Sequence, residues 1–386
     1  MVRREDVTLV GKTKKFIQVG VGGHGAAWVS KFMPRLVKEL KLAEPAAVVD
    51  INPDAFALPR EVYGLPEGKC YTDIQKALDE NPADFVIVVV PPAFHEQVVD
   101  QALAHDLHVL SEKPIADTPE ATARIYQKVK AAGKKMAVTM SHRFDQDKQS
   151  LEHLIKSGEY GRLNCIIGRN TWDNRKFASW GKFRHEIPDT LLVEGTVHHF
   201  DIIRALAGAD AETVYAVTWN PPWGEFAGDS NALVTIQMQN GVKAVYEGNK
   251  TSATRLNGWG NDYFRAECEN ATIVLDSRRL TVMSDLSGER HIVEKPLLQR
   301  DAWTNAWIAE MYVAWLAGGA PPPCHLEDNL QCSALLFAAI ESAHTNRPVD
   351  VQDFLAKRLK SQQAACAAGG LLCRGKQNAQ GIALCT

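Results

Sequence analysis

Four side chains that can exchange protons or bind a metal ion stand close together in an otherwise apolar segment. The segment LLVEGTVHHFD, residues 191–201, contains Glu194, His198, His199 and Asp201. Such a group can form a metal cage, an acid–base site or a set of polar residues that a helix buries. Glu194 and His198 are four residues apart and so share a face of a helix, whereas His199 points about 100° away. Because adjacent histidines do not share a helix face and HExxH is absent, the segment favours acid–base chemistry, and no metal ion is predicted.

A glycine-rich turn lies between the first predicted strand and the helix that follows it. Gly20, Gly22 and Gly25 form the pattern G-x-G-x-x-G. In this context the glycines allow a tight turn, close approach of a pyrophosphate to the backbone and close packing of the helix on the strand. Asp50 ends the next predicted strand, where an acidic residue accepts hydrogen bonds from the ribose hydroxyls of a dinucleotide. A carboxylate repels a 2′-phosphate and no arginine follows Asp50 closely, so the sequence predicts NAD as the cofactor, with NADP less favoured.

Further polar residues follow the later strands of the same half of the chain. Lys113, in SEKP, comes directly after the fifth predicted strand, and Pro91 and His95 come after the fourth. Ligands of open α/β sheets bind at the carboxyl ends of the strands, so these residues are expected at the ligand-binding edge. Arg143 follows the sixth strand and is expected near the same edge as a substrate contact. The alternative for Arg143 is a salt bridge to one of the two aspartates that follow it in the sequence.

The pattern of predicted strands and helices changes in the middle of the chain, and this pattern decides where these residues lie. Strand patterns alternate with helix patterns through about residue 140, which predicts an α/β domain with a doubly wound parallel sheet of the Rossmann type. From about residue 160 the strands are short, and the Asn-Gly of MQNGV marks a hairpin, which predicts an α+β domain with a mostly antiparallel sheet. We therefore expect a dinucleotide-binding domain at 1–145, a substrate and oligomerisation domain at 146–358 and a disordered tail at 359–386. The helix expected at 326–345 can pack back on the first domain.

Composition excludes several classes of protein. With 386 residues, 45% hydrophobic residues and a net charge of −3, the chain is typical of a globular enzyme and has no electrostatic reason to bind nucleic acid or an anionic membrane. No apolar run approaches the ~20 residues that span a bilayer. The charged N-terminus has no secretory signal, so a cytoplasmic location is expected. The eight cysteines form no CxxC pattern and are expected to be free thiols.

Four motifs in their order along the chain resemble those of one enzyme family. GVGGHG, VVVPPAFH, SEKPIA and EGTVHHFD are similar to motifs of the glucose–fructose oxidoreductase / inositol dehydrogenase (Gfo/Idh/MocA) family, over roughly residues 14–350. The resemblance implies a Rossmann domain, a second domain with a large open sheet, and homodimers or homotetramers formed through that sheet. It also implies oxidation or reduction of sugars, inositols or related compounds with a nicotinamide cofactor. The lysine of the family's E-K-P motif falls on Lys113 and its catalytic histidine on His198, but the family's acid is usually aspartate and here it is Glu194.

The residue types at these positions suit such a reaction. Removing hydride from a carbinol carbon requires loss of the hydroxyl proton, and an imidazole with an unperturbed pKa of ~6.5 is a suitable base. A lysine ammonium beside the same oxygen stabilises the developing alkoxide charge. We therefore predict Lys113, His198 and Glu194 as catalytic residues, with Glu194 placed to hold the imidazole. The residues predicted to bind the cofactor are Gly20, Gly22, Gly23, His24, Gly25, Asp50, Pro91, His95, Glu112 and Lys113.

The second half of the chain indicates how a sugar is held. Eight of the nine tryptophans follow residue 150, and the flat apolar faces of indole rings suit the C–H faces of sugars. Trp172 and Arg175, after the first strand of this half, are predicted to wall the substrate together with Arg143. His199 either touches the substrate or packs inside the protein, and Asp201 is predicted to be structural.

The favoured function is an NAD-dependent dehydrogenase that transfers a hydride between a carbinol of an uncharged sugar or polyol and nicotinamide. Among substrates we favour an aldose, a pentose or a branched pentose such as D-apiose, oxidised at C1 to a lactone. The alternatives are an inositol dehydrogenase, a dehydrogenase that forms 3-keto sugars, a non-catalytic sensor of NAD or sugar, and a metal-dependent hydrolase or lyase built on residues 194–201.

Overall fold

The first sheet is parallel, and its strand order reverses at the first strand. The computed structural model describes residues 12–285 and 288–368, and within them six strands form this sheet in the order β3-β2-β1-β4-β5-β6. Its strands are β1 (Lys14–Val19), β2 (Ala43–Val49), β3 (Cys70–Tyr71), β4 (Phe85–Val88), β5 (His108–Ser111) and β6 (Met136–Val138). All four residues of β4 are buried, as expected for a strand covered on both faces. The predicted doubly wound sheet is confirmed, and its switch point lies between β1 and β4, where ligands bind in such sheets.

Helical segments connect the parallel strands of this half. They are α1 (Gly23–Ala27), η1 (Trp28–Phe32), η2 (Arg35–Glu39), η3 (Pro53–Phe56), α2 (Ala57–Tyr63), η4 (Glu67–Lys69), α3 (Ile74–Glu80), η5 (Pro92–Phe94), α4 (His95–Ala104), α5 (Pro119–Ala131) and η6 (Ser141–Phe144). The long helix expected after the glycine turn is present as α1, η1 and η2, and Pro34 lies between the two π-helical segments. The hydroxyl of Thr118 accepts a hydrogen bond from Ala121 N–H and so caps the N-terminus of α5.

The second sheet is mixed, with a single parallel pair near its centre. Nine strands of the described chain form it, in the order β14-β13-β12-β11-β7-β10-β9-β8-β15. The strands are β7 (Leu163–Thr171), β8 (Ala211–Trp219), β9 (Asn231–Met238), β10 (Lys243–Asn249), β11 (Tyr263–Cys268), β12 (Thr272–Asp276), β13 (Arg279–Ser284), β14 (His291–Lys295) and β15 (Val349–Asp350). β7 and β10 run parallel with Thr171 opposite Asn249, so both strands end at the same edge of the sheet. The mostly antiparallel sheet is confirmed, although β13, β14 and β15 were not predicted.

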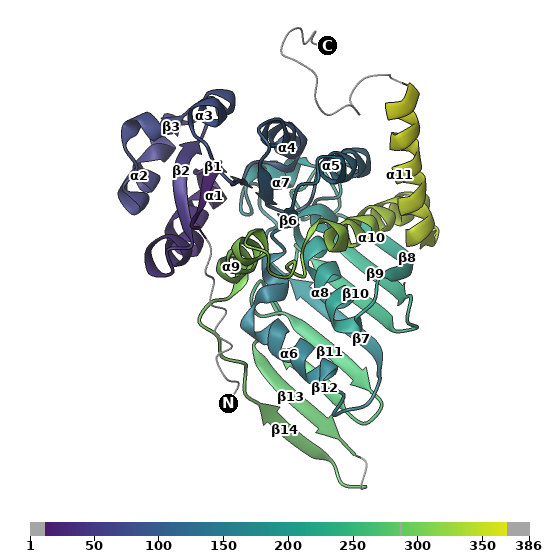
Figure 1. Ribbon diagram of the computed structural model, residues 1–386. Helices are drawn as coiled ribbons and strands as arrows, with labels where there is room; N and C mark the ends of the chain where they lie inside the picture. Colours follow the sequence, from purple (N-terminus) through teal and green to yellow (C-terminus); the bar gives the residue numbers. More distant parts are fainter. Residues whose placement is uncertain (1–11, 286–287, 369–386) are drawn as a thin grey trace.

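Helices cover one face of the second sheet (Figure 1). They are α6 (Gln146–Lys156), η7 (Leu191–Thr196), α8 (Val197–Ala207), α10 (Leu326–Thr345) and α11 (Val351–Ala368). The short α7 (Lys182–Glu186) precedes η7, and α9 (Thr304–Leu316) packs against η1, η2 and η6 of the first half. All residues of α8 are buried, since α8 packs between the sheet and α10. The opposite face of the sheet exposes apolar side chains, among them Val217, Leu233 and Val245 on adjacent strands. A homodimer or homotetramer built on this face remains a prediction.

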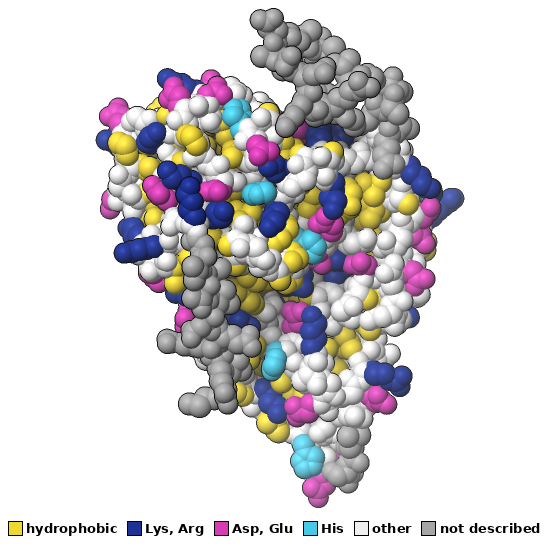
Figure 2. All heavy atoms as spheres, viewed as in Figure 1, with side chains coloured by type: hydrophobic (Ala, Val, Ile, Leu, Met, Phe, Trp, Pro, Cys, Tyr) yellow, Lys and Arg dark blue, Asp and Glu magenta, His cyan; other side chains and the backbone are white. Residues whose placement is uncertain are grey.

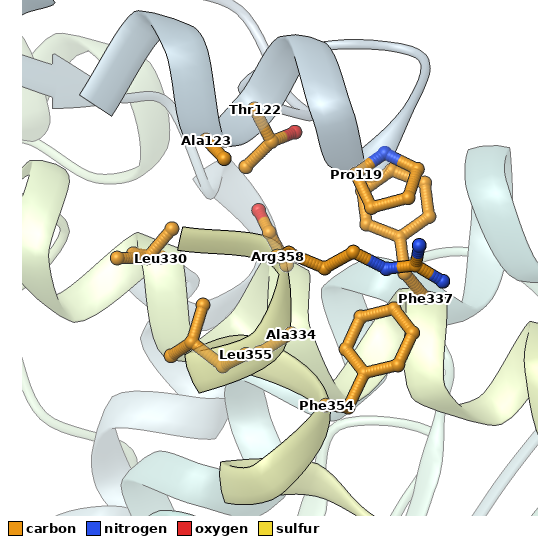
Figure 3. A pocket seen from close by; sticks show the side chains of 10 residues that line it. Pro119, Thr122, Ala123, Leu330, Ala334, Phe337, Phe354, Leu355 and Arg358 are labelled. Atoms are coloured by element: carbon orange, nitrogen blue, oxygen red, sulfur yellow. The ribbon is translucent and has the colours of Figure 1, made fainter. Parts of the chain in front are cut away.

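The last two helices return to the first half of the chain. α10 packs against α5 and β6 as well as against β8, and α11 packs against α5 and α10. The side chains that meet there, shown in Figure 3, are mostly apolar and fill the crevice between α5, α10 and α11, while Arg358 pairs with Glu120 and Glu341 at 3.1 and 3.2 Å. Because α11 continues to Ala368, the tail expected from residue 359 begins later than predicted. The rest of that tail, with Cys373 and Cys385, lies outside the described residues.

Charged side chains of both signs are interspersed over the face shown in Figure 2. Among the described residues no helix is both long and apolar enough to cross a bilayer. The described cysteines whose side chains are placed are all free thiols, as predicted: Cys70, Cys165, Cys268, Cys324 and Cys332.

Candidate active site

The glycine turn after β1 is closed toward the sheet and open on its outer side. Gly20 has a φ of +88°, and a Cβ there would collide with the carbonyl oxygen of Val89. A Cβ at Gly25 would collide with the carbonyl oxygen of Gly20. Gly23, with a φ of +47°, has no atom within 4 Å of the position of a Cβ. The backbone of the turn is therefore closely packed at Gly20 and Gly25 and leaves room for a ligand at Gly23.

Asp50 lies against this turn from the end of β2. Its Oδ2 accepts hydrogen bonds from the N–H groups of Val21 and Gly22, both at 2.9 Å, and its Oδ1 accepts one from Asn52 N–H at 2.9 Å. Each carboxylate oxygen has further acceptor capacity. The open backbone at Gly22 and Gly23 and the carboxylate of Asp50 fit a dinucleotide whose ribose hydroxyl is unphosphorylated, since a 2′-phosphate would meet the negative charge of Asp50.

Glu112 ties the loop after β5 to the helix after the glycine turn. Its Oε1 accepts a hydrogen bond from Trp28 Nε1–H at 2.8 Å and lies 3.1 Å from His24 Nε2 and 3.4 Å from Asn305 Nδ2. Burial alone would raise the pKa of Glu112, but His24, Trp28 and Lys113 hold it below its ordinary value. Glu112 thus fixes the loop that carries Lys113, and the exposed His24 is the member of this group that can reach a cofactor.

His95 lies beneath the same loop. Its Nδ1 is 3.0 Å from the carbonyl oxygen of Pro114 and 3.3 Å from that of Ile115, and its Nε2 is 2.9 Å from the carbonyl oxygen of Val90. The ring is fully buried, and burial lowers its pKa. Because both ring nitrogens face backbone oxygens, we reassign His95 from cofactor contact to positioning of the loop, whereas Pro91 remains an exposed candidate for the cofactor.

Lys113 joins the two halves of the chain at the site. Its Nζ donates hydrogen bonds to the backbone oxygen of Glu194 at 3.1 Å and to Glu194 Oε2 at 3.3 Å. The same Oε2 accepts a hydrogen bond from Arg184 Nε at 2.8 Å. Burial alone would raise the pKa of Glu194, but the charges of Lys113 and Arg184 lower it. Glu194 is therefore an ionised carboxylate held between two cations.

The helix that carries Glu194 and His198 begins with a π-helical turn. η7 ends at Thr196 and α8 begins at Val197. Glu194 therefore lies in the π-helical turn and His198 in the first turn of the α-helix. Among the described residues no hydrogen bond joins Glu194 to His198, because the carboxylate is bound to Lys113 and Arg184. The prediction that Glu194 holds the imidazole is therefore wrong.

His198 is buried beside several positive charges. Only 4% of it is exposed, it has no hydrogen-bond partner in the described part of the chain, and its Nδ1 is fully buried. Nε2 is therefore the ring nitrogen left to face the site. Burial, together with the charges of Lys113, His142, His199 and Lys250, lowers the pKa of His198 well below its ordinary value. The imidazole is thus neutral near pH 7 and free to accept a proton.

Trp259 covers this imidazole. Its ring centroid is 4.9 Å from that of His198 with the rings nearly perpendicular, and 3.9 Å from that of His142 with the rings stacked. Trp259 is still 42% exposed. The free part of the indole offers a flat apolar surface beside His198, on which the C–H face of a sugar or polyol can pack.

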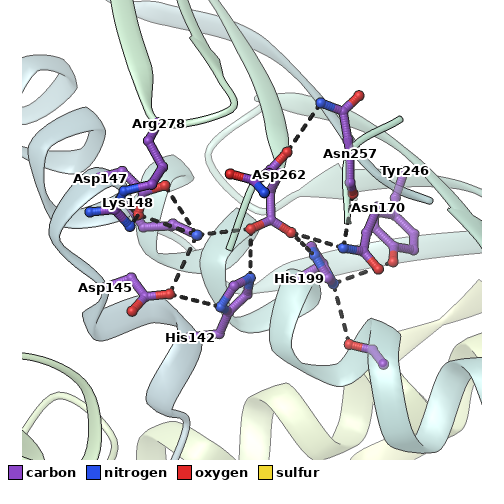
Figure 4. Close-up of polar contacts among 12 residues, drawn as sticks. His142, Asp145, Asp147, Lys148, Asn170, His199, Tyr246, Asn257, Asp262 and Arg278 are labelled. Atoms are coloured by element: carbon purple, nitrogen blue, oxygen red, sulfur yellow. Dashed lines mark hydrogen bonds and ion pairs between the residues drawn. The ribbon is translucent and has the colours of Figure 1, made fainter. Parts of the chain in front are cut away.

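Asp262 is the centre of a buried polar network behind these rings (Figure 4). Its Oδ2 lies 2.8 Å from both Lys148 Nζ and His142 Nε2, and its Oδ1 accepts a hydrogen bond from Asn170 Nδ2 at 3.0 Å. Burial alone would raise the pKa of Asp262, but His142 and Lys148 hold it well below its ordinary value. The negative charge of Asp262 is therefore neutralised within the network.

His199 belongs to the same network. Its Nε2 lies 2.9 Å from Asp262 Oδ1, and its Nδ1 lies 3.2 Å from the carbonyl oxygen of Gly195 and 3.3 Å from the hydroxyl of Tyr246. The ring is completely buried. Of the two roles considered for His199, the structure shows packing inside the protein, and the predicted substrate contact is wrong.

The donor set around Asp262 does not fit a metal centre. His142, His199 and Asp262 present ligand atoms within 4.8 Å of one another. The ammonium of Lys148, however, lies 2.8 Å from Asp262 Oδ2 and supplies the positive charge that a metal ion would bring. We therefore assign no metal ion to this cluster.

Lys250 is a site residue that the sequence did not indicate. It follows the end of β10, is only 3% exposed, and donates a hydrogen bond to Asn170 Oδ1 at 3.2 Å. Burial lowers the pKa of Lys250 to about 8, with the charge of Asp262 opposing this shift and the charge of Lys113 adding to it. A second buried lysine therefore stands near Lys113 and His198.

Arg143 and Asp201 lie in a separate buried cluster. Arg143 Nη1 is 3.5 Å from both Asp201 Oδ1 and Asp328 Oδ2 and donates a hydrogen bond to the carbonyl oxygen of Pro323 at 2.9 Å. Arg204 also lies near Asp201, at 3.7 Å. The structural role expected of Asp201 agrees with this placement, but the contact expected between Arg143 and the substrate is wrong, because its guanidinium is buried among these partners.

Trp172 and Arg175 follow β7, as expected from the sequence. The Trp172 ring packs so closely on Gly258, the neighbour of Trp259, that a Cβ at Gly258 would collide with it. Arg175 pairs with Asp173 through two hydrogen bonds of 2.8 and 2.9 Å. We retain Trp172 as a candidate substrate wall beside Trp259, whereas the guanidinium of Arg175 is already bound to its neighbour.

Comparison with known proteins identifies the two halves separately. Residues 17–140 match a family model described as an oxidoreductase family with an NAD-binding Rossmann fold. Residues 149–274 match the model of the GFO/IDH/MocA C-terminal domain.

Similar whole proteins are found both by sequence and by structure. The chain is 42% identical over 350 residues to the uncharacterized protein y4oX of Sinorhizobium fredii, covering 89% of this chain and 97% of that protein. It is 28% identical over 241 residues to inositol 2-dehydrogenase of Pseudarthrobacter chlorophenolicus, covering 61% of this chain and 67% of that protein. The crystal structure of an oxidoreductase from Agrobacterium radiobacter, in complex with NAD+, L-tartaric acid and magnesium, superposes with a TM-score of 0.77 at 21% identity, covering 89% and 99% of the two chains. At that identity the superposition shows a shared fold.

Proposed function

Because the chain belongs to the GFO/IDH/MocA family of oxidoreductases with an NAD-binding Rossmann fold, we propose that it is an NAD-dependent dehydrogenase acting on a carbinol of a sugar or polyol. The observation that carries this proposal is the neutral imidazole of His198 beside the ammonium of Lys113, at the carboxyl ends of the parallel strands. One group can accept a proton and the other can stabilise an oxyanion, which are the two needs of carbinol oxidation.

His198 is the group we assign to proton acceptance. Its Nε2 is the free nitrogen, and the surrounding positive charges keep the ring neutral. When the carbinol C–H bond breaks, the hydroxyl proton moves to this nitrogen and the C–O bond becomes a carbonyl. NAD, when bound, accepts the hydride that leaves the carbon, so that one carbinol is oxidised as one NAD is reduced.

Lys113 is the group we assign to orienting the hydroxyl and stabilising the alkoxide. Two of its hydrogen bonds go to Glu194, at 3.1 and 3.3 Å, which fixes the direction of the ammonium. A third N–H remains for the substrate oxygen. Glu194 thereby acts through Lys113 and is a positioning residue.

The residues around His198 suit a ring that carries several hydroxyl groups. Trp259 supplies the apolar surface and Trp172 extends it through Gly258. The similarity to inositol 2-dehydrogenases supports a cyclic polyol over the aldose that we favoured from the residues alone. Oxidation of a ring hydroxyl of a cyclic polyol or sugar is therefore the proposed reaction.

The test is NAD reduction by the purified full chain against a panel of inositols, aldoses and their acids. We expect NADH to form with at least one member, and Lys113→Ala to lower kcat by about 10²- to 10⁴-fold while NAD still binds. Lys243→Ala is the matched control, because Lys243 is exposed at the other end of β10 from Lys250. Turnover that survives Lys113→Ala unchanged, or the absence of turnover with every compound, contradicts the proposed function.

A further inference from the structure

Positive charge exceeds negative charge in the candidate site. Three cationic side chains lie close together: Lys113, Lys250 and Arg184. Burial lowers the pKa of Lys250, and the charges of Lys113 and Arg184 lower it further. One carboxylate, Glu194, lies among them and binds Lys113 and Arg184. A second carboxylate, Asp262, opposes the lowering of the pKa of Lys250, but it is itself held by Lys148 and His142, at 2.8 Å each.

Lys250 is the least satisfied of these cations. Its ammonium has three donors, and among the described residues it donates one hydrogen bond, to the neutral amide of Asn170 at 3.2 Å. The ring of Trp180 lies 4.6 Å from the ammonium and supplies a weak further attraction. A charge that is 97% buried with so few partners is unfavourable in the empty protein, because desolvation of an ammonium is repaid only by a counter-ion or by several hydrogen bonds.

The backbone next to Glu194 makes room for this lysine. A Cβ at Gly195 would lie 3.2 Å from Lys250 Cε and 3.5 Å from its Nζ, so a larger residue would press on the lysine chain. The Lys250 ammonium therefore lies against Gly195, the residue that follows Glu194. It is also close enough to His198 that its charge lowers the pKa of that imidazole.

The guanidinium of Arg184 shares the ring of Trp180 with Lys250, since its Cζ lies 5.6 Å from the ring centroid. Its Nε binds Glu194 and its Nη1 donates to the carbonyl oxygen of Trp180 at 3.3 Å. Its Nη2 has no partner among the residues that the structure describes. The side chain is 31% exposed, so Nη2 is accessible to a ligand.

We propose that the substrate of this site is a sugar acid or polyol acid, whose carboxylate is bound by Lys250 and Arg184. This inference rests on the proposed function and deepens it by naming the substrate class. One excess positive charge is matched by the carboxylate and the other by the alkoxide that develops beside Lys113. With a neutral substrate, the carboxylates whose charges act on Lys250 are those of Asp262 and Glu194, and both are already bound by other cations. The uncharged substrate expected from the sequence is thereby replaced, because that expectation took no account of Lys250 and Arg184.

The experiment compares binding of matched acids and neutral sugars to the NAD-loaded full chain by titration calorimetry. The pairs are D-glucuronate with D-glucose and D-galacturonate with D-galactose, and D-glucose 6-phosphate is the phosphate arm. We expect at least one acid to bind at least about tenfold more tightly than its neutral partner. Lys250→Met removes this preference, Lys250→Arg keeps part of it, and the control Lys243→Met keeps all of it.

Three results would overturn the inference: equal binding of acid and neutral sugar, no acid binding below about 10 mM, or tighter binding of the phosphate than of every carboxylate. The two proposals fail separately. Lys113-dependent turnover of neutral polyols without preference for acids rejects only the sugar acid. Lys250-dependent binding of acids without any NADH formation rejects only the dehydrogenase.

Discussion

The ammonium of Lys113 lies 3.3 Å from the carboxylate of Glu194, and this ion pair crosses from the parallel sheet to the helix of the second sheet. The carboxylate also holds Arg184, at 2.8 Å. Two cations bound to one carboxylate oxygen explain a glutamate at a position where the resemblance led us to expect aspartate. The longer side chain reaches from the π-helical turn to both partners.

Removal of the charge at Glu194 is expected to destabilise the protein. Glu194→Gln leaves Lys113, Arg184 and Lys250 without a carboxylate among them, and breaking a buried ion pair in this way costs about 3 kcal/mol. Glu194→Asp keeps the charge and is expected to lose less. Urea denaturation at pH 7 measures the difference, with the exposed Glu186→Gln as control. A Glu194→Gln protein as stable as the wild type would show that the three cations need no counter-ion.

The neutrality of His198 is expected to make the protein sensitive to acid. Its pKa in the folded state is well below the unfolded value of ~6.5, so between these two values the unfolded chain binds the proton and the native state does not. The free energy of unfolding therefore falls as the pH falls from about 6.5, by at most about 1.4 kcal/mol per pH unit for this one group. His198→Gln should show a smaller fall between pH 7 and 5, measured by denaturant titration. Equal slopes for the two proteins would mean that His198 is protonated as easily in the fold as in the unfolded chain.

Replacement of Lys250 is expected to stabilise the protein. Its folded pKa of about 8 lies below its unfolded value of ~10.4, so below pH 8 the native state carries an unfavourable buried charge. Lys250→Met should raise the free energy of unfolding at pH 7 by about 1–3 kcal/mol. The gain should shrink as the pH rises from 8 towards 10, where the native lysine is neutral. A variant that is less stable than the wild type at pH 7 would contradict the picture of an uncompensated cation.

Shortening Trp259 is expected to weaken substrate binding more than catalysis. The indole is 42% exposed, so Trp259→Ala removes a surface beside His198 with little loss of core packing. We expect KM to rise about tenfold with a smaller change in kcat, since the apolar contact is made in both the ground state and the transition state. Trp259→Phe should restore part of the loss. Unchanged KM in Trp259→Ala would place the substrate on another surface.

The nucleotide end could be predicted because its signals are local in the sequence. The glycine turn, the apolar run of β4 and Asp50 after β2 can each be recognised from a few neighbouring residues. The structure places them at one edge of the sheet. The role of His95 was mistaken because its partners, the backbone oxygens of residues 90, 114 and 115, are visible only when the loop after β5 folds over it.

The substrate end could be predicted only in part. Glu194 binds Lys113 and Arg184, which come from distant parts of the sequence, so the four-residue spacing to His198 did not reveal its partners. β7 and β10 pair in parallel although about 80 residues separate them, whereas the hairpin signals around β9 and β10 indicated only antiparallel neighbours. That long-range pairing is what brings Lys250 beside the loop after β7, so its sequence neighbours alone gave no sign of it.

The parallel pairing of β7 and β10 separates the tasks of the two halves of the molecule. Both strands end at one edge, where Trp172 and Lys250 emerge side by side from residues that take no part in holding the glycine turn. Under the proposed function, exchanges at these two strand ends are expected to change substrate selectivity while the glycine turn is left intact. A search for new substrate specificities can therefore begin with substitutions at positions 172 and 250 and leave the nucleotide-binding half unchanged.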